Sequence, residues 1–311
     1  KSTAVGYQAL STQNFTSATD SNNTAVGYNA GSLITTGTDN TVVGTDALDA
    51  NTTGSYNTAV GTSSLGANTT GEFNTAVGYK ALEDNTTGSR NTGVGRLSIG
   101  NNTTGDFNTG IGYSSLATNT TADNNTALGY GTLAVNTTGD RNVAVGSNAL
   151  DANTTGTDNT GIGDNSGTAV TTGQANTFVG DSSGLVNTTA SNNTGMGQSA
   201  LAANTTGANN VAVGASALLS NTTGSDNIAM GKGTLDANTT GASNTGIGHD
   251  ALTSNTTADN NTAVGYASML VNTTGANNVA VGRDSMLSNT EGDENVAVGA
   301  DSLLQAVIML L

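Results

Sequence analysis

Residues 74–90 read Asn-Thr-Ala-Val-Gly-Tyr-Lys-Ala-Leu-Glu-Asp-Asn-Thr-Thr-Gly-Ser-Arg, and this 17-residue unit recurs with small changes along the chain. We number its positions 1 to 17, so that Asn74 is repeat position 1 and Arg90 is repeat position 17. The glycine at position 5 recurs once in every such unit, from Gly27 through Gly44 and Gly61 to Gly299. A fixed period of this length is typical of a solenoid protein, in which each repeat forms one coil.

The residue types in the repeat favour short strands over helices. Position 4 is always Val, Ile, Leu or Met, and the Gly, Asn and Thr that dominate other positions are poor helix formers. The chain has 43 glycines and no proline, so no backbone N–H is lost from a β-ladder. One repeat is long enough for two short strands and two turns. The sequence therefore predicts an all-β fold, a parallel β-solenoid or β-roll of about 18 coils with one 17-residue repeat in each coil.

Two segments depart from the continuous solenoid predicted for residues 1–304. The interval from Gly6 to Gly27 is longer than the later intervals, which places a four-residue insertion within residues 11–21. The largely apolar residues 305–311 replace the Asn-Thr-Thr-Gly part of the last repeat. Because an open solenoid end exposes a strand edge, we expect this tail to cap the end or to add to the first coil of another copy.

The alternation of side chains along an extended segment predicts which residues form the core. We expect positions 2 and 4 to face inwards and the Ala or Gly usual at position 3 to form an outward strip. Such a strip suits either close packing against another chain or relief of crowding at a bend. Position 9, mostly Leu, supplies a second core residue. The predicted core residues are Val26, Val60, Val77, Val145, Val213, Val281, Leu48, Leu82, Leu150 and Leu218.

Charge and composition exclude several classes of protein. A net charge of −16 at pH 7 opposes binding to nucleic acid. With no cysteine, one histidine and no acid pair that breaks the repeat, the chain lacks the residues of a catalytic or metal site. It also lacks a run of about 20 apolar residues that could span a bilayer. We expect no enzyme, cofactor, metal, nucleic-acid partner or membrane insertion.

Asn-x-Thr sequons are the most frequent chemical motif, and 13 of them start at position 12. One interpretation is a column of N- or O-linked glycans on a secreted protein. The alternative is an asparagine and threonine ladder that joins successive coils and carries nothing. The glycosylation candidates are Asn51, Asn68, Asn85, Asn102, Asn119, Asn136, Asn153, Asn187, Asn204, Asn221, Asn238, Asn255, Asn272, Asn124, Asn192 and Asn260.

Two further columns suggest binding surfaces. Threonines at positions 2, 13 and 14 suggest a face that orders water, although the adjacent Thr52 and Thr53 point to opposite sides. Six tyrosines at position 6 form either a stripe for stacking on sugars or a packing layer over the turn. They are Tyr7, Tyr28, Tyr79, Tyr113, Tyr130 and Tyr266.

Residues 142–149 read Asn-Val-Ala-Val-Gly-Ser-Asn-Ala, and residues 278–282 read Asn-Val-Ala-Val-Gly. This pattern resembles the head repeats of trimeric autotransporter adhesins, whose motif is close to Ser-Val-Ala-Ile-Gly-x-x-Ala. It is also similar to Gly-rich repeats of bacteriophage tail-fibre proteins. The resemblance implies a left-handed parallel β-roll, three chains wound side by side and a surface-exposed adhesive role.

These observations together favour a structural extracellular fibre or filament subunit, or an adhesin-type shaft. We expect it to assemble with copies of itself, as a trimer or as an end-to-end filament, and to be glycosylated along the Asn-Thr-Thr ladder. Its expected location is extracellular or on a cell or virion surface. The alternatives are a glycan-binding phage-fibre or adhesin head and an ice-binding β-solenoid.

Overall fold

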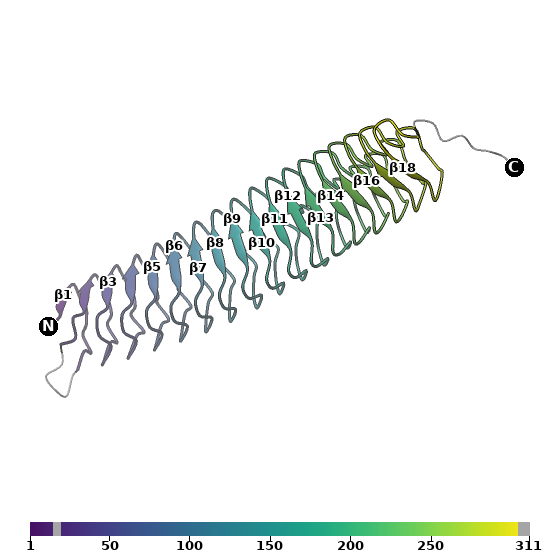
Figure 1. The fold of residues 1–311 in the computed structure, drawn as a ribbon. Coiled ribbons are helices and arrows are strands. Elements are labelled where there is room, and N and C mark those ends of the chain that lie inside the picture. The colour runs from purple at the N-terminus through teal and green to yellow at the C-terminus, as the bar shows by residue number, and fades with distance from the viewer. Residues whose placement is uncertain (15–19, 304–311) are drawn as a thin grey trace. The chain divides into compact units, whose positions relative to one another are not determined.

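The computed structural model describes residues 1–14 and 20–303. It is an all-β parallel β-solenoid with 18 strands, one in each turn of the repeat, which confirms the predicted fold class (Figure 1). The tail predicted at 305–311 and part of the insertion predicted within 11–21 lie outside the described residues.

The chain divides into two compact units, Lys1–Thr157 and Asp158–Leu311, and each is described by itself. Every strand has three residues and occupies positions 2 to 4. The first unit contains β1 (Thr3–Val5), β2 (Thr24–Val26), β3 (Thr41–Val43), β4 (Thr58–Val60), β5 (Thr75–Val77), β6 (Thr92–Val94), β7 (Thr109–Ile111), β8 (Thr126–Leu128) and β9 (Val143–Val145). The second contains β10 (Thr160–Ile162), β11 (Thr177–Val179), β12 (Thr194–Met196), β13 (Val211–Val213), β14 (Ile228–Met230), β15 (Thr245–Ile247), β16 (Thr262–Val264), β17 (Val279–Val281) and β18 (Val296–Val298).

Consecutive strands within each unit pair in parallel with a register of one repeat. In β4 and β5, for example, Thr58 is opposite Thr75 and Val60 is opposite Val77. Each repeat position therefore forms a column of equivalent residues along the unit. This register places like side chains next to one another, as expected for a solenoid built from near-identical repeats.

Each coil has one strand, so the prediction of two strands per coil is wrong. The remaining positions turn repeatedly because three residues per coil adopt the left-handed conformation. In the coil that contains β3 these are Asp46, Leu48 and Tyr56, with φ of 52°, 49° and 61°. A residue with positive φ breaks the extended geometry that a second strand would need.

Position 3 faces the core, and positions 2 and 4 face outwards. Ala59, Ala76 and Ala144 are fully buried. The prediction that the position-4 valines form the core, and that position 3 forms an outward strip, is therefore wrong. Three of the six predicted valines are exposed: Val26, Val77 and Val281. The other three are half-buried: Val60, Val145 and Val213.

The leucine at position 9 explains why small residues line the inner side of the strand. Leu48, Leu82, Leu150 and Leu218 are fully buried, as predicted. A Cβ added to Gly93 at position 3 would lie 3.3 Å from Cγ of Leu82 in the preceding coil. Because the leucine already fills the narrow interior, position 3 accommodates little more than a methyl group.

Three coils have glycine in place of the position-9 leucine, and another buried apolar side chain compensates in each. They contain Gly31, Gly167 and Gly184, and the compensating residues are Ile34, Val170 and Phe178. In the third coil the compensating residue is at position 3, because Phe178 is fully buried, whereas Val186, which follows Gly184 by two residues, is exposed.

Candidate functional site

The outer face of the strands is the main candidate for an interaction surface. We call it the outer strip and define it by the side chains at positions 2 and 4. Position 2 is Thr, Val or Ile and position 4 is Val, Ile, Leu or Met in all 18 repeats, so the outer strip carries no charge. Ile111 and Leu128 in the first unit are 38% and 45% exposed, and Met196 and Met230 in the second are each 44% exposed. Apolar side chains thus recur on the surface in every coil.

The threonines of the outer strip differ from those at position 13. Position-13 hydroxyls donate to the position-13 carbonyl of the next coil, as Thr52 Oγ1 does to the Thr69 oxygen at 3.1 Å. Within the described part of the first unit, the hydroxyls of Thr58, Thr75 and Thr92 have no intramolecular hydrogen-bond partner. These hydroxyls remain available to a molecule that binds the strip.

Rings and guanidinium groups form two columns beside the outer strip in the first unit. At position 17, the rings of Tyr56 and Phe73 stack with centroids 4.9 Å apart, and Phe73 is followed by Arg90 and Phe107. At position 6, the column contains Tyr79, Arg96, Tyr113 and Tyr130. The position-17 column was not predicted, although three aromatic residues at one repeat position are visible in the sequence.

The position-6 tyrosines use their ring faces on one another. Tyr7 stacks on Tyr28 and Tyr113 stacks on Tyr130, both with centroids 5.3 Å apart and with interplanar angles of 13° and 10°. Stacking on a sugar requires a free ring face. The ring faces between these pairs are occupied, and the tyrosines present their edges and hydroxyls instead.

The position-12 asparagines form a buried ladder, and the structure corrects their interpretation as glycan sites. Nδ2 of Asn68 donates to Oδ1 of Asn51 at 2.9 Å and to the carbonyl oxygen of Gly71 at 3.1 Å. Nδ2 is the atom that an N-linked glycan would modify, and here it is a buried donor to two acceptors. The fully buried candidates are Asn51, Asn68, Asn85, Asn102, Asn119, Asn136, Asn153, Asn187, Asn204, Asn221, Asn238, Asn255 and Asn272.

A second asparagine ladder runs along position 1. Oδ1 of Asn57 accepts from the backbone N–H of Asn74 at 3.0 Å, and Nδ2 of Asn74 donates to the Gly88 carbonyl at 2.8 Å. Buried amides in successive coils thus satisfy each other and the adjacent backbone, as buried polar groups must. The interior is stabilised by these polar ladders as well as by the leucine column.

Three of the predicted glycan sites are accessible. Asn124, Asn192 and Asn260 lie at position 17 and are exposed, each with φ of 60°. Each begins an Asn-Asn-Thr sequon. The structure therefore separates the predicted sites into 13 buried and three exposed.

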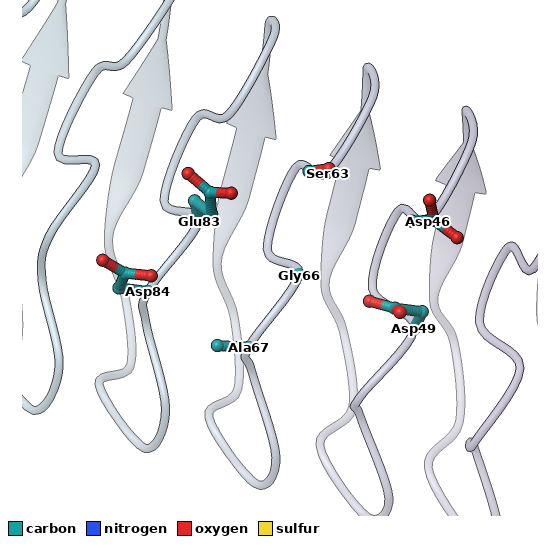
Figure 2. Close-up of a pocket in the computed structure, with 7 residues that line it drawn as sticks. All are labelled: Asp46, Asp49, Ser63, Gly66, Ala67, Glu83 and Asp84. Carbon is teal, nitrogen blue, oxygen red and sulfur yellow. The ribbon is translucent and has the colours of Figure 1, made fainter.

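An acidic cavity of about 370 Å³ lies on the surface of the first unit (Figure 2). Gly66 and Ala67 form its floor because their side chains are small, and carboxylates come from the coils on either side. Burial, with a smaller contribution from Asp46, raises the pKa of Asp49 above its usual 3.8. The lining residues are Asp46, Asp49, Ser63, Gly66, Ala67, Glu83 and Asp84. Across residues 1–14 and 20–303, no three acidic or histidine side chains are arranged to hold a metal ion.

No family model matches the chain, and no curated protein matches it. In the described ranges, the structure contains no helix long and apolar enough to cross a membrane.

Proposed function

We propose that the chain is a non-enzymatic structural subunit of an extracellular fibre or adhesin-type shaft, and that its copies associate side by side through the outer strip. The observation that carries this proposal is the uncharged outer strip in a chain of net charge −16. A row of exposed Val, Ile, Leu and Met side chains of this kind is uncommon on a protein that works as a monomer.

Electrostatics favours the outer strip over other surfaces as the contact between copies. Two chains of this charge repel each other at most orientations, and the repulsion is smallest where the facing surfaces carry no charge. The strip meets that condition at positions 2 and 4 of every repeat. A second copy also presents the same rows of side chains at the same spacing, which makes the surface self-complementary.

The strip of each unit offers a substantial contact area. Three residues span about 10 Å and successive coils are about 4.8 Å apart, so the strip covers roughly 430 Å² in a unit of nine coils. The strip of one unit is thus about half of the ~800 Å² per partner of a standard interface, and each of the two units carries such a strip. Unpaired threonine hydroxyls can add hydrogen bonds between copies.

Sparse glycosylation at Asn124, Asn192 and Asn260 belongs to the same proposal. Asn192 and Asn260, both in the second unit, are four coils apart, roughly 19 Å, which leaves room for a glycan at each. Mass spectrometry of peptides from material secreted by a glycosylating host should find glycan at the three exposed sites. Modification of position 12 in folded material would contradict the buried ladder.

Ice binding is a second candidate, because the position-2 threonines share one outward face with the position-4 side chains. Eight consecutive coils, β1 to β8, place Thr at position 2 and Val, Ile or Leu at position 4 of one outward face. Regular hydroxyl and methyl groups on a parallel sheet could order water. Ice binding requires the strip to be free, whereas the fibre proposal requires it to be covered.

Paired glutamate substitutions test the association. The variant Ile111→Glu/Leu128→Glu places two charges on the strip, and the control Thr104→Glu/Thr121→Glu places two at exposed position 14 of neighbouring coils. Analytical ultracentrifugation should give a single-chain mass for the strip variant and the unchanged multi-chain mass for the control. A strip variant that keeps the native mass would contradict the proposal.

A further inference from the structure

The position-6 column of the first unit contains a fixed cation between aromatic rings. The Arg96 guanidinium carbon lies 5.6 Å from the ring centroid of Tyr79 and 5.3 Å from that of Tyr113, and its Nη1 donates to the Tyr113 hydroxyl at 3.0 Å. The Tyr130 ring stacks on the far side of Tyr113. Four successive coils therefore present one column of polar groups: a phenol hydroxyl, a guanidinium and two further phenol hydroxyls, in that order.

Arg96 has no carboxylate partner among the described residues, although the chain is strongly acidic. Two of the other arginines differ: Arg283 lies 3.0 Å from Asp301, and Arg141 lies 3.9 Å from Asp140. Lys80, the cation next to Tyr79 in sequence, is neutralised by Glu83 at 2.8 Å. The positive charge of Arg96 is therefore both fixed in place and uncompensated.

The surroundings of this column allow an anion to approach. Between residues 91 and 140, the only acidic residues are Asp106, Asp123 and Asp140, all at position 16. Each carboxylate accepts a hydrogen bond from a backbone N–H of the preceding coil, at 2.6, 2.7 and 2.8 Å, which fixes its place in the position-16 turn. The coils of Arg96, Tyr113 and Tyr130 thus carry no carboxylate at positions 1 to 15, whereas the coil of Tyr79 carries Asp84 and also Glu83, which pairs with Lys80.

We propose that Tyr79, Arg96, Tyr113 and Tyr130 bind an anionic polysaccharide that lies along the column. The guanidinium faces are covered by the two rings, and its in-plane N–H groups pair with a carboxylate or sulfate of the polymer. The phenol hydroxyls form hydrogen bonds with sugar hydroxyls on either side. Because Arg96 and Tyr130 cover the two faces of Tyr113, its contacts with the polymer use the ring edge and the hydroxyl.

The chemistry of the column favours a sparse polyanion over nucleic acid. A nucleic acid carries a phosphate at every nucleotide, and one guanidinium cannot offset its repulsion by a chain of net charge −16. A polysaccharide with occasional acidic groups needs only one ion pair and many hydroxyl contacts. The column lies outside positions 2 and 4, so this proposal does not depend on association through the outer strip.

Arg90 provides a matched control for the test. Arg90 lies two residues before the start of β6, and Arg96 lies two residues after the end of β6. The guanidinium carbon of Arg90 lies 5.5 Å from the ring centroid of Phe73 and 5.2 Å from that of Phe107. The two arginines thus share a charge and a two-ring environment on either side of one strand, but Phe73 and Phe107 provide no hydroxyl. Substitution of either arginine removes the same charge.

The experiment measures binding of the full chain to three immobilised polymers with one backbone: lightly carboxymethylated dextran, lightly sulfated dextran and neutral dextran. We expect binding to one or both of the lightly charged dextrans and none to neutral dextran, with preference between the two identifying carboxylate or sulfate as the bound group. Arg96→Gln should weaken binding about tenfold, the loss of one charge-assisted hydrogen bond, while Arg90→Gln changes it by less than about twofold. The proposal would be overturned if both variants lost the same affinity or if Arg96→Gln lost none. Tighter binding of single-stranded DNA than of either charged polysaccharide would also overturn it.

Discussion

A Cβ placed on Gly184 would collide with Cδ1 and Cε1 of Phe178, so the phenylalanine occupies the space that a leucine fills in other coils. Phe178 is at position 3 and Gly184 is at position 9 of the same repeat. The two positions therefore share one interior volume, and either can hold the large side chain. This relationship establishes that position 3 faces inwards.

The shared volume predicts strong coupling between these two residues. Phe178→Ala should cost about 3–5 kcal/mol by leaving a cavity. Gly184→Leu alone should cost about 3 kcal/mol because the leucine meets the ring. The double variant restores Ala at position 3 and Leu at position 9, and φ of 62° at Gly184 is close to the 49° of Leu48. Thermal and denaturant unfolding should place it near the unmodified chain; additive losses would contradict a shared volume.

Adjacent residues of β9 test the direction of the strand faces. Ala144→Asp buries an unpaired carboxylate and should unfold the surrounding coils, because this residue is fully buried. Val145→Asp should leave the fold intact, since Val145 is half-buried on the outer side. Circular dichroism and limited proteolysis distinguish the two outcomes. Unfolding by Val145→Asp with tolerance of Ala144→Asp would reverse the assigned faces.

The buried amide ladder should contribute measurably to stability. Asn136 donates to Asn119 at 3.0 Å and to Gly139 at 2.9 Å, and accepts from Asn153 at 2.8 Å. Asn136→Ala leaves these groups without partners and should lower the free energy of unfolding by about 2–4 kcal/mol. Asn101→Ala, at an exposed asparagine, is the control and should change it little. Equal effects in urea unfolding would show that the ladder is energetically neutral.

Asp236 should make the chain less stable as pH rises. Burial, followed by the charge of Asp250, raises its pKa above the usual 3.8. The folded chain therefore binds this proton more tightly than the unfolded chain, so stability is highest below 3.8 and falls as pH rises through the raised pKa. Asp236→Asn should raise the melting temperature at pH 7 and flatten this part of the pH profile. An unchanged profile in thermal scans would show that the carboxylate is well solvated.

The repeat period and residue types were sufficient to predict the fold class and the leucine column. They could not settle which face of each strand is buried. Successive side chains point to opposite faces of a strand, and this pattern is the same whether position 3 or positions 2 and 4 face the core. The strand Thr75–Val77 has its larger side chains outside, since Leu82 already fills the interior.

The asparagine ladders show a second limit of sequence reasoning. A sequon such as that of Asn85 resembles a surface motif, and its burial depends on hydrogen bonds to the next coil. The position-6 and position-17 columns likewise depend on register. Stacking between Tyr56 and Phe73 requires both the constant repeat length and a fixed turn geometry, which only the assembled coils provide.

The native mass of the unmodified chain tests the central claim most directly. Sedimentation equilibrium at micromolar concentration should give a multiple of 30.5 kDa, three copies if the assembly follows the resemblance to trimeric adhesin repeats. The same value should persist at high salt, because the outer strip carries no charge. A single 30.5 kDa species at every concentration would contradict association through the outer strip and would favour the ice-binding alternative.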